Sequence, residues 1–178
     1  RVSCAMGANF FMEIAKLRAL RVLWARIMEA FGAEEEDRAV HVHGRASAFT
    51  KTVYDPYVNL LRNTTQAFSG VVGGLNSLEV APFDQPIRKA DDFSRRIARN
   101  IQVMLPTEFE LRQPVDPVGG SWYVETLAAE LCEKIWTEFQ TIESKGGIVA
   151  ALKEGYPQAQ VKAVLEERFK NLAYRRDV

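Results

Sequence analysis

Two histidines occupy alternate positions at the end of a predicted strand. The run Arg38–His43 has the apolar character of a strand, and strand side chains alternate between two faces. One face carries Ala39, His41 and His43, and the other carries Val40 and Val42. The valines suit packing against helices, whereas a buried imidazole needs hydrogen-bonding partners. If the histidine face lines the interior of a barrel, both imidazoles point into its lumen.

The segment Gly44–Ser47 adds a guanidinium and a hydroxyl directly after this predicted strand. Arg45 and Ser47 then lie at the carboxyl end of the strand, where barrels and open α/β enzymes keep their binding sites. Histidine, arginine and serine in this arrangement predict a ligand-binding site. A structural histidine pair beside a surface arginine is the alternative that the residue types leave open.

Other patterns that could carry chemistry are weaker. Arg95, Arg96 and Arg99 could meet a phosphate, but charges at helical spacing are typical of a solvated helix face. The turns VGG and DPVGGS lack both the lysine of a phosphate loop and the spaced glycines of a dinucleotide fingerprint. No HExxH motif occurs, and two histidines with the remote Cys4 and Cys132 do not have a zinc-ligand spacing. We therefore expect neither a metal site nor a hydrolase.

The composition is that of an ordinary globular protein. Of 178 residues, 47% are apolar and 26% are charged, and 23 basic side chains balance 23 acidic ones. This balance provides no global field for nucleic acid or an anionic membrane, so neither is an expected partner. Two cysteines far apart fit a reducing compartment, and no apolar run approaches the length of a membrane span. We expect a cytoplasmic location.

Short apolar runs alternate with long amphipathic patterns, which predicts parallel strands joined by helices and an α/β fold. Asn9 is the predicted N-cap of the first helix, and Asp55 with Pro56 is predicted to open the second. The predicted strands are 2–6, 38–43 and 75–80, and the predicted helices are 9–32, 55–73, 92–105, 122–144, 148–154 and 157–175. Three parallel strands leave sheet edges uncovered. We expect further polypeptide, a second copy or a partner chain to cover them.

Five strings occur in the order and spacing of one enzyme family: NFFMEIAKLRALRVLW, KTVYDPYVNLLRNT, FSRRIARNIQ, PVDPVGGSWYVETL and IESKGGIVAALKEG. Together they resemble the methylmalonyl-CoA mutase family, the adenosylcobalamin-dependent acyl-CoA mutases. The resemblance implies that residues 1–178 are a single segment, the C-terminal part of a (β/α)8 TIM barrel followed by extra C-terminal helices. In that family, acyl-CoA threads along the barrel axis beneath a corrin held by a separate flavodoxin-like domain. The cobalamin-binding signature Asp-x-His-x-x-Gly is absent from this sequence, so we expect no such domain here and no cobalamin bound by this segment alone.

The resemblance also implies contacts to acyl-CoA. Arg1 and Ser3 resemble an Arg-x-Ser pair that contacts CoA phosphate and pantetheine groups, and a guanidinium fits phosphate geometry. His41 falls where catalytic relatives often place a basic CoA-contacting residue. His43 matches a histidine in the lumen near the substrate. These four residues are predicted substrate-binding residues by resemblance.

Departures from the family pattern concern the carboxyl end of the barrel. Arg45 replaces a family glutamine, and Asn76 replaces another that contacts the acyl-CoA chain; both are predicted substrate-binding residues. Catalytic relatives commonly have His-Thr-Asn and then Asp-Glu, where this chain has Glu79–Ala81 and then Asp84 with Gln85. Polar groups that would face the corrin are thereby lost.

These departures predict a chain similar to the family's small subunits, which pair with a catalytic subunit and do not themselves perform turnover. Adenosylcobalamin would then belong to the complete enzyme, in which a radical formed by cobalt–carbon homolysis starts the carbon-skeleton rearrangement. No catalytic residue is predicted in this segment. Two alternatives remain: a catalytic mutase for a different branched acyl-CoA, and an assembly module without enzymatic activity.

Overall fold

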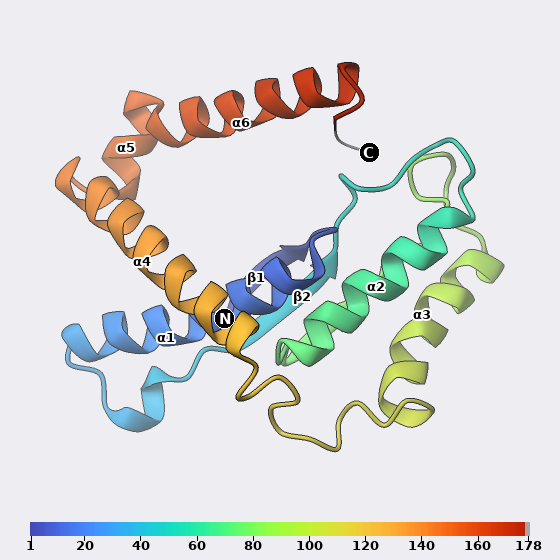
Figure 1. The fold of residues 1–178 in the computed structure, drawn as a ribbon, viewed down its shortest axis with the longest axis horizontal. Helices are drawn as coiled ribbons and strands as arrows, with labels where there is room; N and C mark the ends of the chain where they lie inside the picture. The colour runs from blue at the N-terminus through green and yellow to red at the C-terminus, as the bar shows by residue number, and fades with distance from the viewer. Residues whose placement is uncertain (177–178) are drawn as a thin grey trace. The chain divides into compact units, whose positions relative to one another are not determined.

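The computed structural model describes residues 1–176 as alternating strands and helices (Figure 1). The residues group into two compact units, one from Arg1 to Cys132 and a second that begins at Glu133. The strands are β1 (Val2–Met6), β2 (Val42–Ala46) and β3 (Ser77–Glu79). The helices are α1 (Phe10–Ala30), the 3₁₀ helix η1 (Glu35–Arg38), α2 (Val58–Val72), α3 (Asp92–Thr107), α4 (Trp122–Ser144), α5 (Ile148–Glu154) and α6 (Tyr156–Ala173).

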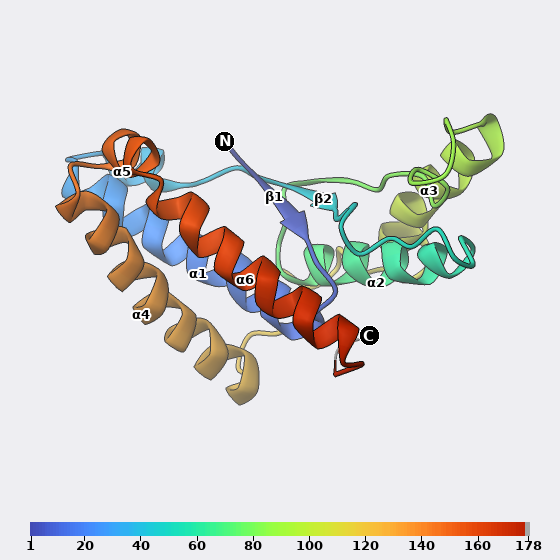
Figure 2. The same cartoon turned by 90° about the horizontal axis from the view of Figure 1, so that it is seen from above.

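The three strands of the first unit form one parallel sheet in the order β1-β2-β3. Helices α1 and α2 lie on the same side of this sheet, as Figure 2 shows. Apolar residues of α1, of the first two strands and of the segment before β2 pack there into a buried cluster of Met6, Leu17, Val40 and Val42. The predicted α/β class is confirmed. The partial-barrel interpretation stays a prediction, because the described strands form an open sheet.

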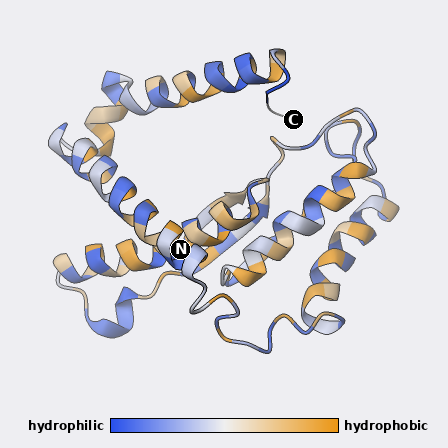
Figure 3. Ribbon diagram, viewed as in Figure 1, coloured by the Kyte–Doolittle hydropathy of each residue, from blue (hydrophilic) through white to orange (hydrophobic). Residues whose placement is uncertain are grey.

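Local sequence signals account for where several helices begin and end. The side chain of Asn9 accepts a hydrogen bond from the backbone N–H of Met12 at 3.3 Å, so the predicted N-cap of α1 is confirmed. Gly32 follows α1 with a φ of +79°, which glycine adopts without strain. Hydrophobic and hydrophilic positions recur in turn along α2 and α3 (Figure 3), as expected for helices with one buried side.

Two predicted boundaries are wrong. Arg38, predicted to open a strand, is instead the last residue of η1, and its side chain bonds back to the Ala33 carbonyl and the Glu29 carboxylate. Strand β2 therefore begins at Val42, where pairing with β1 starts, and it ends at Ala46, opposite Met6.

The second helix also begins later than predicted. Asp55 has a φ of +46°, and its carbonyl accepts a hydrogen bond from the N–H of Val58 at 3.1 Å. Asp55 therefore belongs to a turn, and Tyr57 is the residue that precedes α2. The predicted strand 75–80 is shortened to Ser77–Glu79.

Glycines separate the helices of the second unit. Gly147 precedes α5 with a φ of +85°, and Gly155 joins α5 to α6 with a φ of +79°. The Lys145 ammonium lies 4.7 Å from the centre of the Tyr156 ring. The predicted helices 148–154 and 157–175 are confirmed within two residues at each end. Among the described residues, no helix combines the length and apolarity that a membrane crossing requires.

Candidate functional site

The face of the sheet opposite α1 and α2 is polar. Along β2, Val42, Gly44 and Ala46 are buried, while Arg45 is exposed and His43 is half-buried. Because β2 is the central strand, each of its residues has a neighbour on both sides. His43 lies between Ser3 of β1 and Ser77 of β3, and Arg45 lies between Ala5 of β1 and Glu79 of β3. We call Ser3, His43, Arg45, Ser77 and Glu79 the polar sheet face. The predicted alternation of side chains is thus confirmed.

The two histidines share one hydroxyl. Nδ1 of His43 lies 2.9 Å from Oγ of Ser77, and Nε2 of His41 lies 3.3 Å from the same oxygen. A serine hydroxyl can donate one hydrogen bond and also accept, so it can link two neutral imidazoles in a chain. Both histidines therefore have a structural partner, and His41 remains exposed to other contacts. Ser77 was not singled out in the sequence; its register opposite a histidine is visible only in the sheet.

Arg45 lies in β2 and not in a loop after it. Its Nε is 3.3 Å from Oε1 of Glu79 on β3, and the two side chains remain 54% and 49% exposed. Ser47, also predicted near this end, is used in a turn in which its Oγ accepts from the N–H of Phe49. The carboxyl ends of β2 and β3 thus carry a guanidinium and a carboxylate that are accessible to a ligand.

Lys51 joins these charges from the loop after β2. Its Nζ lies 3.0 Å from Oε1 of Gln85 and 3.5 Å from the Pro82 carbonyl, so two neutral oxygens accept its protons. Burial lowers the pKa of the Lys51 ammonium below its ordinary value, and the nearby Arg45 lowers it further, against an opposing effect of Glu79. Lys51 was not predicted from the sequence, since no periodic pattern marks a lysine in a loop.

A buried polar stripe on α2 holds the two loops that follow β2 and β3. The carboxamide of Asn59 accepts from the Thr52 N–H at 3.1 Å and donates to the Thr52 carbonyl at 2.9 Å and the Phe83 carbonyl at 3.0 Å. Asn63 donates to the Ala81 carbonyl at 2.9 Å. The spacing Asn59, Asn63, Gln66 is the helical one, which was the available sequence signal for a shared face.

Asn76 and Arg1 lie toward the amino ends of the strands. The side-chain oxygen of Asn76 accepts from the Val42 N–H at 2.9 Å and from Nη2 of Arg21 at 3.0 Å. Nη1 of Arg21 also donates to the Val40 carbonyl at 3.0 Å, so these groups tie α1 to the start of β2 and β3. Arg1, next to β1, is exposed. The predicted ligand residues therefore extend along the sheet and do not form a single cluster, and their acyl-CoA contacts stay predictions.

Comparison with known proteins decides the family. The family described as "Methylmalonyl-CoA mutase" matches residues 1–178, the whole chain. The chain belongs to this mutase family. A methylmalonyl-CoA mutase small subunit of Porphyromonas gingivalis is 41% identical over 175 residues, which are 97% of this chain and 28% of that protein. This confirms the resemblance read from the five strings.

Relatives named as mutases or as large subunits are about as similar to the chain as the small subunits are. A methylmalonyl-CoA mutase of Rhizobium meliloti is 41% identical over 92% of this chain and 23% of its own length. The large subunit of Porphyromonas gingivalis is 39% identical over 89% of this chain and 22% of its own length. The chain thus spans about a quarter of the length of these relatives, and overall identity does not separate the two branches.

Several of the strings shared with the mutase family hold elements together. Nζ of Lys16 in α1 donates to the Ala5 carbonyl of β1 at 2.7 Å and pairs with Glu13. Nη1 of Arg18 lies 2.8 Å from both carboxylate oxygens of Asp116, and this guanidinium lowers the pKa of that carboxyl. Within the string PVDPVGGSWYVETL, the predicted turn DPVGGS is therefore held to α1 through Asp116, and the residues from Trp122 onward begin α4.

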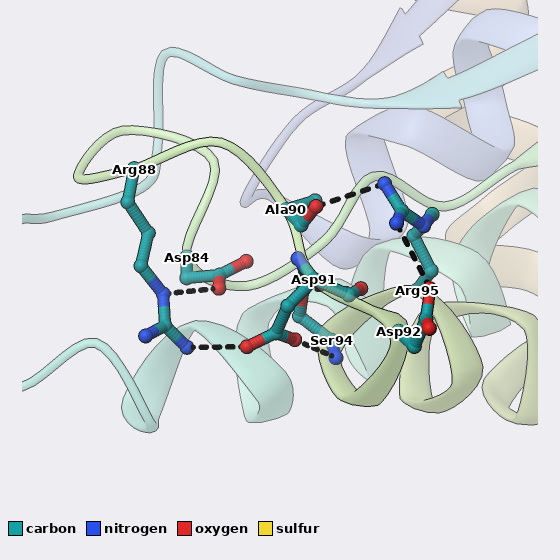
Figure 4. A network of polar contacts seen from close by, with 7 residues as sticks. All are labelled: Asp84, Arg88, Ala90, Asp91, Asp92, Ser94 and Arg95. Carbon is teal, nitrogen blue, oxygen red and sulfur yellow. Dashed lines mark hydrogen bonds and ion pairs between the residues drawn. The ribbon is translucent and has the colours of Figure 1, made fainter.

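The string FSRRIARNIQ belongs to α3, whose start is fixed by a polar network (Figure 4). Arg88 bridges Oδ2 of Asp84 at 2.9 Å and Oδ2 of Asp91 at 3.0 Å, while Oδ1 of Asp91 accepts from the Ser94 N–H at 2.8 Å. That backbone hydrogen bond lowers the pKa of Asp91. Arg95, one of the three arginines predicted to form a solvated helix face, donates to the Ala90 carbonyl and pairs with Asp92 within this network.

The residues present do not fit a cobalamin site of their own. Histidine is the commonest metal-ligating side chain, and both histidines of the chain are hydrogen-bonded to the Ser77 hydroxyl on the polar sheet face. In the part of the chain that the structure describes, no group of three or more His, Cys, Asp or Glu is arranged to hold a metal ion. We therefore derive no step of chemistry through the cofactor from these residues.

Proposed function

We propose that the chain is part of the acyl-CoA-binding barrel of an adenosylcobalamin-dependent mutase, in a protein of the small-subunit type. Its role is to complete a barrel and a heterodimer with a catalytic subunit, without turnover of its own. The observation that carries the proposal is the polar sheet face, opposite the side covered by α1 and α2. In a closed barrel this face is the inner one.

The substitutions at the carboxyl end of β3 support a non-catalytic role. Val80 and Ala81 are 4% and 3% exposed, and Val80 belongs to a buried apolar cluster. The Ala81 carbonyl accepts the hydrogen bond from Asn63. Positions where catalytic relatives have polar residues are thus used here for packing. Glu79, the remaining polar residue of the three, is paired with Arg45.

Of the six predicted acyl-CoA contacts, Ser3, His43 and Arg45 lie on the polar sheet face, Arg1 and His41 directly precede β1 and β2, and Asn76 is bonded to Arg21 of α1. Arg1 would bind a phosphate of the coenzyme, with Ser3 next to it on β1. Replacing Arg1 by alanine in the full-length protein should weaken acyl-CoA binding by about 1 to 3 kcal/mol, the cost of losing a charge-assisted hydrogen bond. Calorimetry measures this, with the exposed Arg112→Ala as a control that removes the same charge elsewhere. Equal weakening in both variants would reject the assignment of Arg1.

Turnover assays with purified full-length proteins test the non-catalytic role. The chain alone, a catalytic mutase subunit alone and both together are supplied with methylmalonyl-CoA and adenosylcobalamin. We expect no succinyl-CoA from the chain alone and a stable complex of the two proteins by sedimentation. Turnover by the chain alone would contradict the proposal.

A second candidate is a catalytic mutase for a different branched acyl-CoA. The observation in its favour is the exposed pair Arg45 and Glu79, which changes the chemistry of the sheet face where the substrate would lie. Assays of the full-length protein against a series of branched acyl-CoAs decide between the candidates. Product from any of them favours this second one, and no product from all of them removes it.

The third alternative, an assembly module, draws on the open edges of the parallel sheet. It predicts association of the chain through β1 or β3 in the absence of acyl-CoA. Sedimentation equilibrium of the chain, with and without acyl-CoA, distinguishes it. A non-associating monomer would contradict this alternative.

A further inference from the structure

The carboxyl ends of β2 and β3 bring two cations together with one carboxylate. Arg45, Lys51 and Glu79 meet there, and the pair of Arg45 with Glu79 is 3.3 Å long and about half exposed. The hydrogen bonds of Lys51 go to neutral oxygens of Gln85 and Pro82. With Arg45 and Lys51 positive and Glu79 negative, the net charge of the three side chains is one positive charge. We propose that Arg45 and Lys51 form a binding site for the carboxylate of a singly charged organic ligand.

Lys51 is held in place before any ligand arrives. Its neighbours in sequence are both hydrogen-bonded to α2: Nε2 of Gln66 donates to Oγ1 of Thr50 at 2.6 Å, and Asn59 bonds both backbone groups of Thr52. Asn59 is fully buried and Gln66 is 2% exposed, so these contacts are shielded from water. A cation fixed in this way loses little freedom when an anion binds, which strengthens binding.

The ammonium of Lys51 has an unfavourable environment without an anion. It is half-buried next to the guanidinium of Arg45, and both burial and this like charge lower its pKa. A carboxylate placed between the two cations would remove both penalties, because it pairs with each of them. Lys51 donates to two neutral oxygens while Glu79 pairs with Arg45 at 3.3 Å, so the two cations together can accept one further negative charge.

Glu79 acts as the internal counter-ion when no ligand is bound. Its pair with Arg45 is exposed, and exposed ion pairs are weak, so a ligand carboxylate can replace it at low cost. One spare positive charge suits a carboxylate with a single charge better than a phosphate with two. Removing the charge of Glu79 should therefore tighten binding of a carboxylate.

The biological role of this site rests on the proposed function. The site adds a subsite for a carboxylate next to the polar sheet face. Small free carboxylates test it without coenzyme or cofactor. A failure here would leave acyl-CoA binding by the other residues untouched. Conversely, absence of acyl-CoA binding would not remove a carboxylate site that these titrations detect.

The experiment is an NMR titration of the full chain at constant ionic strength, with amide signals of Arg45, Lys51 and Gln85 as probes. Propionate is the ligand, propionamide is its uncharged control of the same shape, and inorganic phosphate is the third arm. We expect saturable shifts with propionate and none with propionamide. Lys51→Gln and Arg45→Gln should each weaken propionate binding about tenfold, since each removes one charge-assisted contact.

Two further variants keep the test independent of folding. Glu79→Gln should bind propionate several-fold more tightly, a gain that misfolding cannot produce. Lys134→Gln removes a charge from an exposed lysine of α4 and should leave binding unchanged. The proposal is overturned if propionate and propionamide give the same shifts, if Lys51→Gln binds propionate as tightly as the natural chain, or if phosphate alone saturates the site.

Discussion

Replacing Asn59 by alanine tests whether α2 determines the positions of the two loops at the carboxyl end of the sheet. The Asn59 side chain is fully buried and makes three hydrogen bonds to loop backbone: two with Thr52 and one with Phe83. It also accepts a fourth from Nη1 of Arg62 at 2.9 Å. The substitution removes all four and leaves a small void.

The expected loss of unfolding free energy is about 3 kcal/mol. Each of the three backbone contacts contributes about 1 kcal/mol net, and groups left buried without a partner cost at least that much. The bond from Arg62 adds little, because a guanidinium readily finds water. The higher helix propensity of alanine stabilises the variant by about 0.5 kcal/mol, and the void left by the missing carboxamide destabilises it by a similar amount.

Urea unfolding followed by circular dichroism measures this difference. Asn100→Ala is the matched control, since Asn100 is also in a helix but exposed, and we expect it to leave stability unchanged or slightly raised. Hydrogen exchange at Thr52 and at the loop after β3 should accelerate only in Asn59→Ala. Equal midpoints for both variants would refute the role assigned to the buried carboxamide.

Three other substitutions have measurable outcomes. Gly44→Ala would place its Cβ 2.1 Å from Cδ1 of Leu75, so we expect a loss of about 1 to 3 kcal/mol in urea unfolding, and unchanged stability would contradict this close packing. Arg18→Ala should raise the pKa of Asp116 in a ¹³C NMR titration, because that guanidinium is the main cause of the lowered value; an unmoved pKa would reject the clasp. Since the pKa of Asp91 is lower in the folded chain than in the unfolded one, the unfolded chain takes up more protons as the pH falls below about 4, and stability declines there. Asp91→Asn should show a shallower decline in acid unfolding, and an identical slope would oppose the assignment.

Elements with strong local signals could be predicted from the sequence. Strand 2–6 and helix 122–144 match the structure residue for residue, and the N-cap at Asn9 was recognised from residue type and position. The start of β2 could not be found in this way. It depends on the Arg38 side chain, which bonds back to the end of α1, and on pairing with β1 from Val2 onward.

The candidate site could be predicted only in part, for a similar reason. Period-two alternation correctly put His41 and His43 on the face opposite Val42, whereas Arg45 was expected after the strand and lies within it. Their partners Ser77 and Glu79 come from another strand, and Lys51 comes from a loop. Contacts of this kind depend on register and loop path, which a single sequence does not encode as a periodic pattern.

The residues that identify the family and the residues that decide activity are different sets in this chain. Lys16 ties α1 to β1 through the Ala5 carbonyl, and Arg18 ties α1 to the turn at Asp116, so these parts of the family strings hold the scaffold together. Such contacts are needed by any chain with this fold, whether or not it performs turnover. The proposed difference in activity instead lies at Arg45 and Glu79, on the face that the strings do not cover. Sequence identity is therefore similar toward large and small subunits, and turnover measured for the full-length protein distinguishes the two proposed roles.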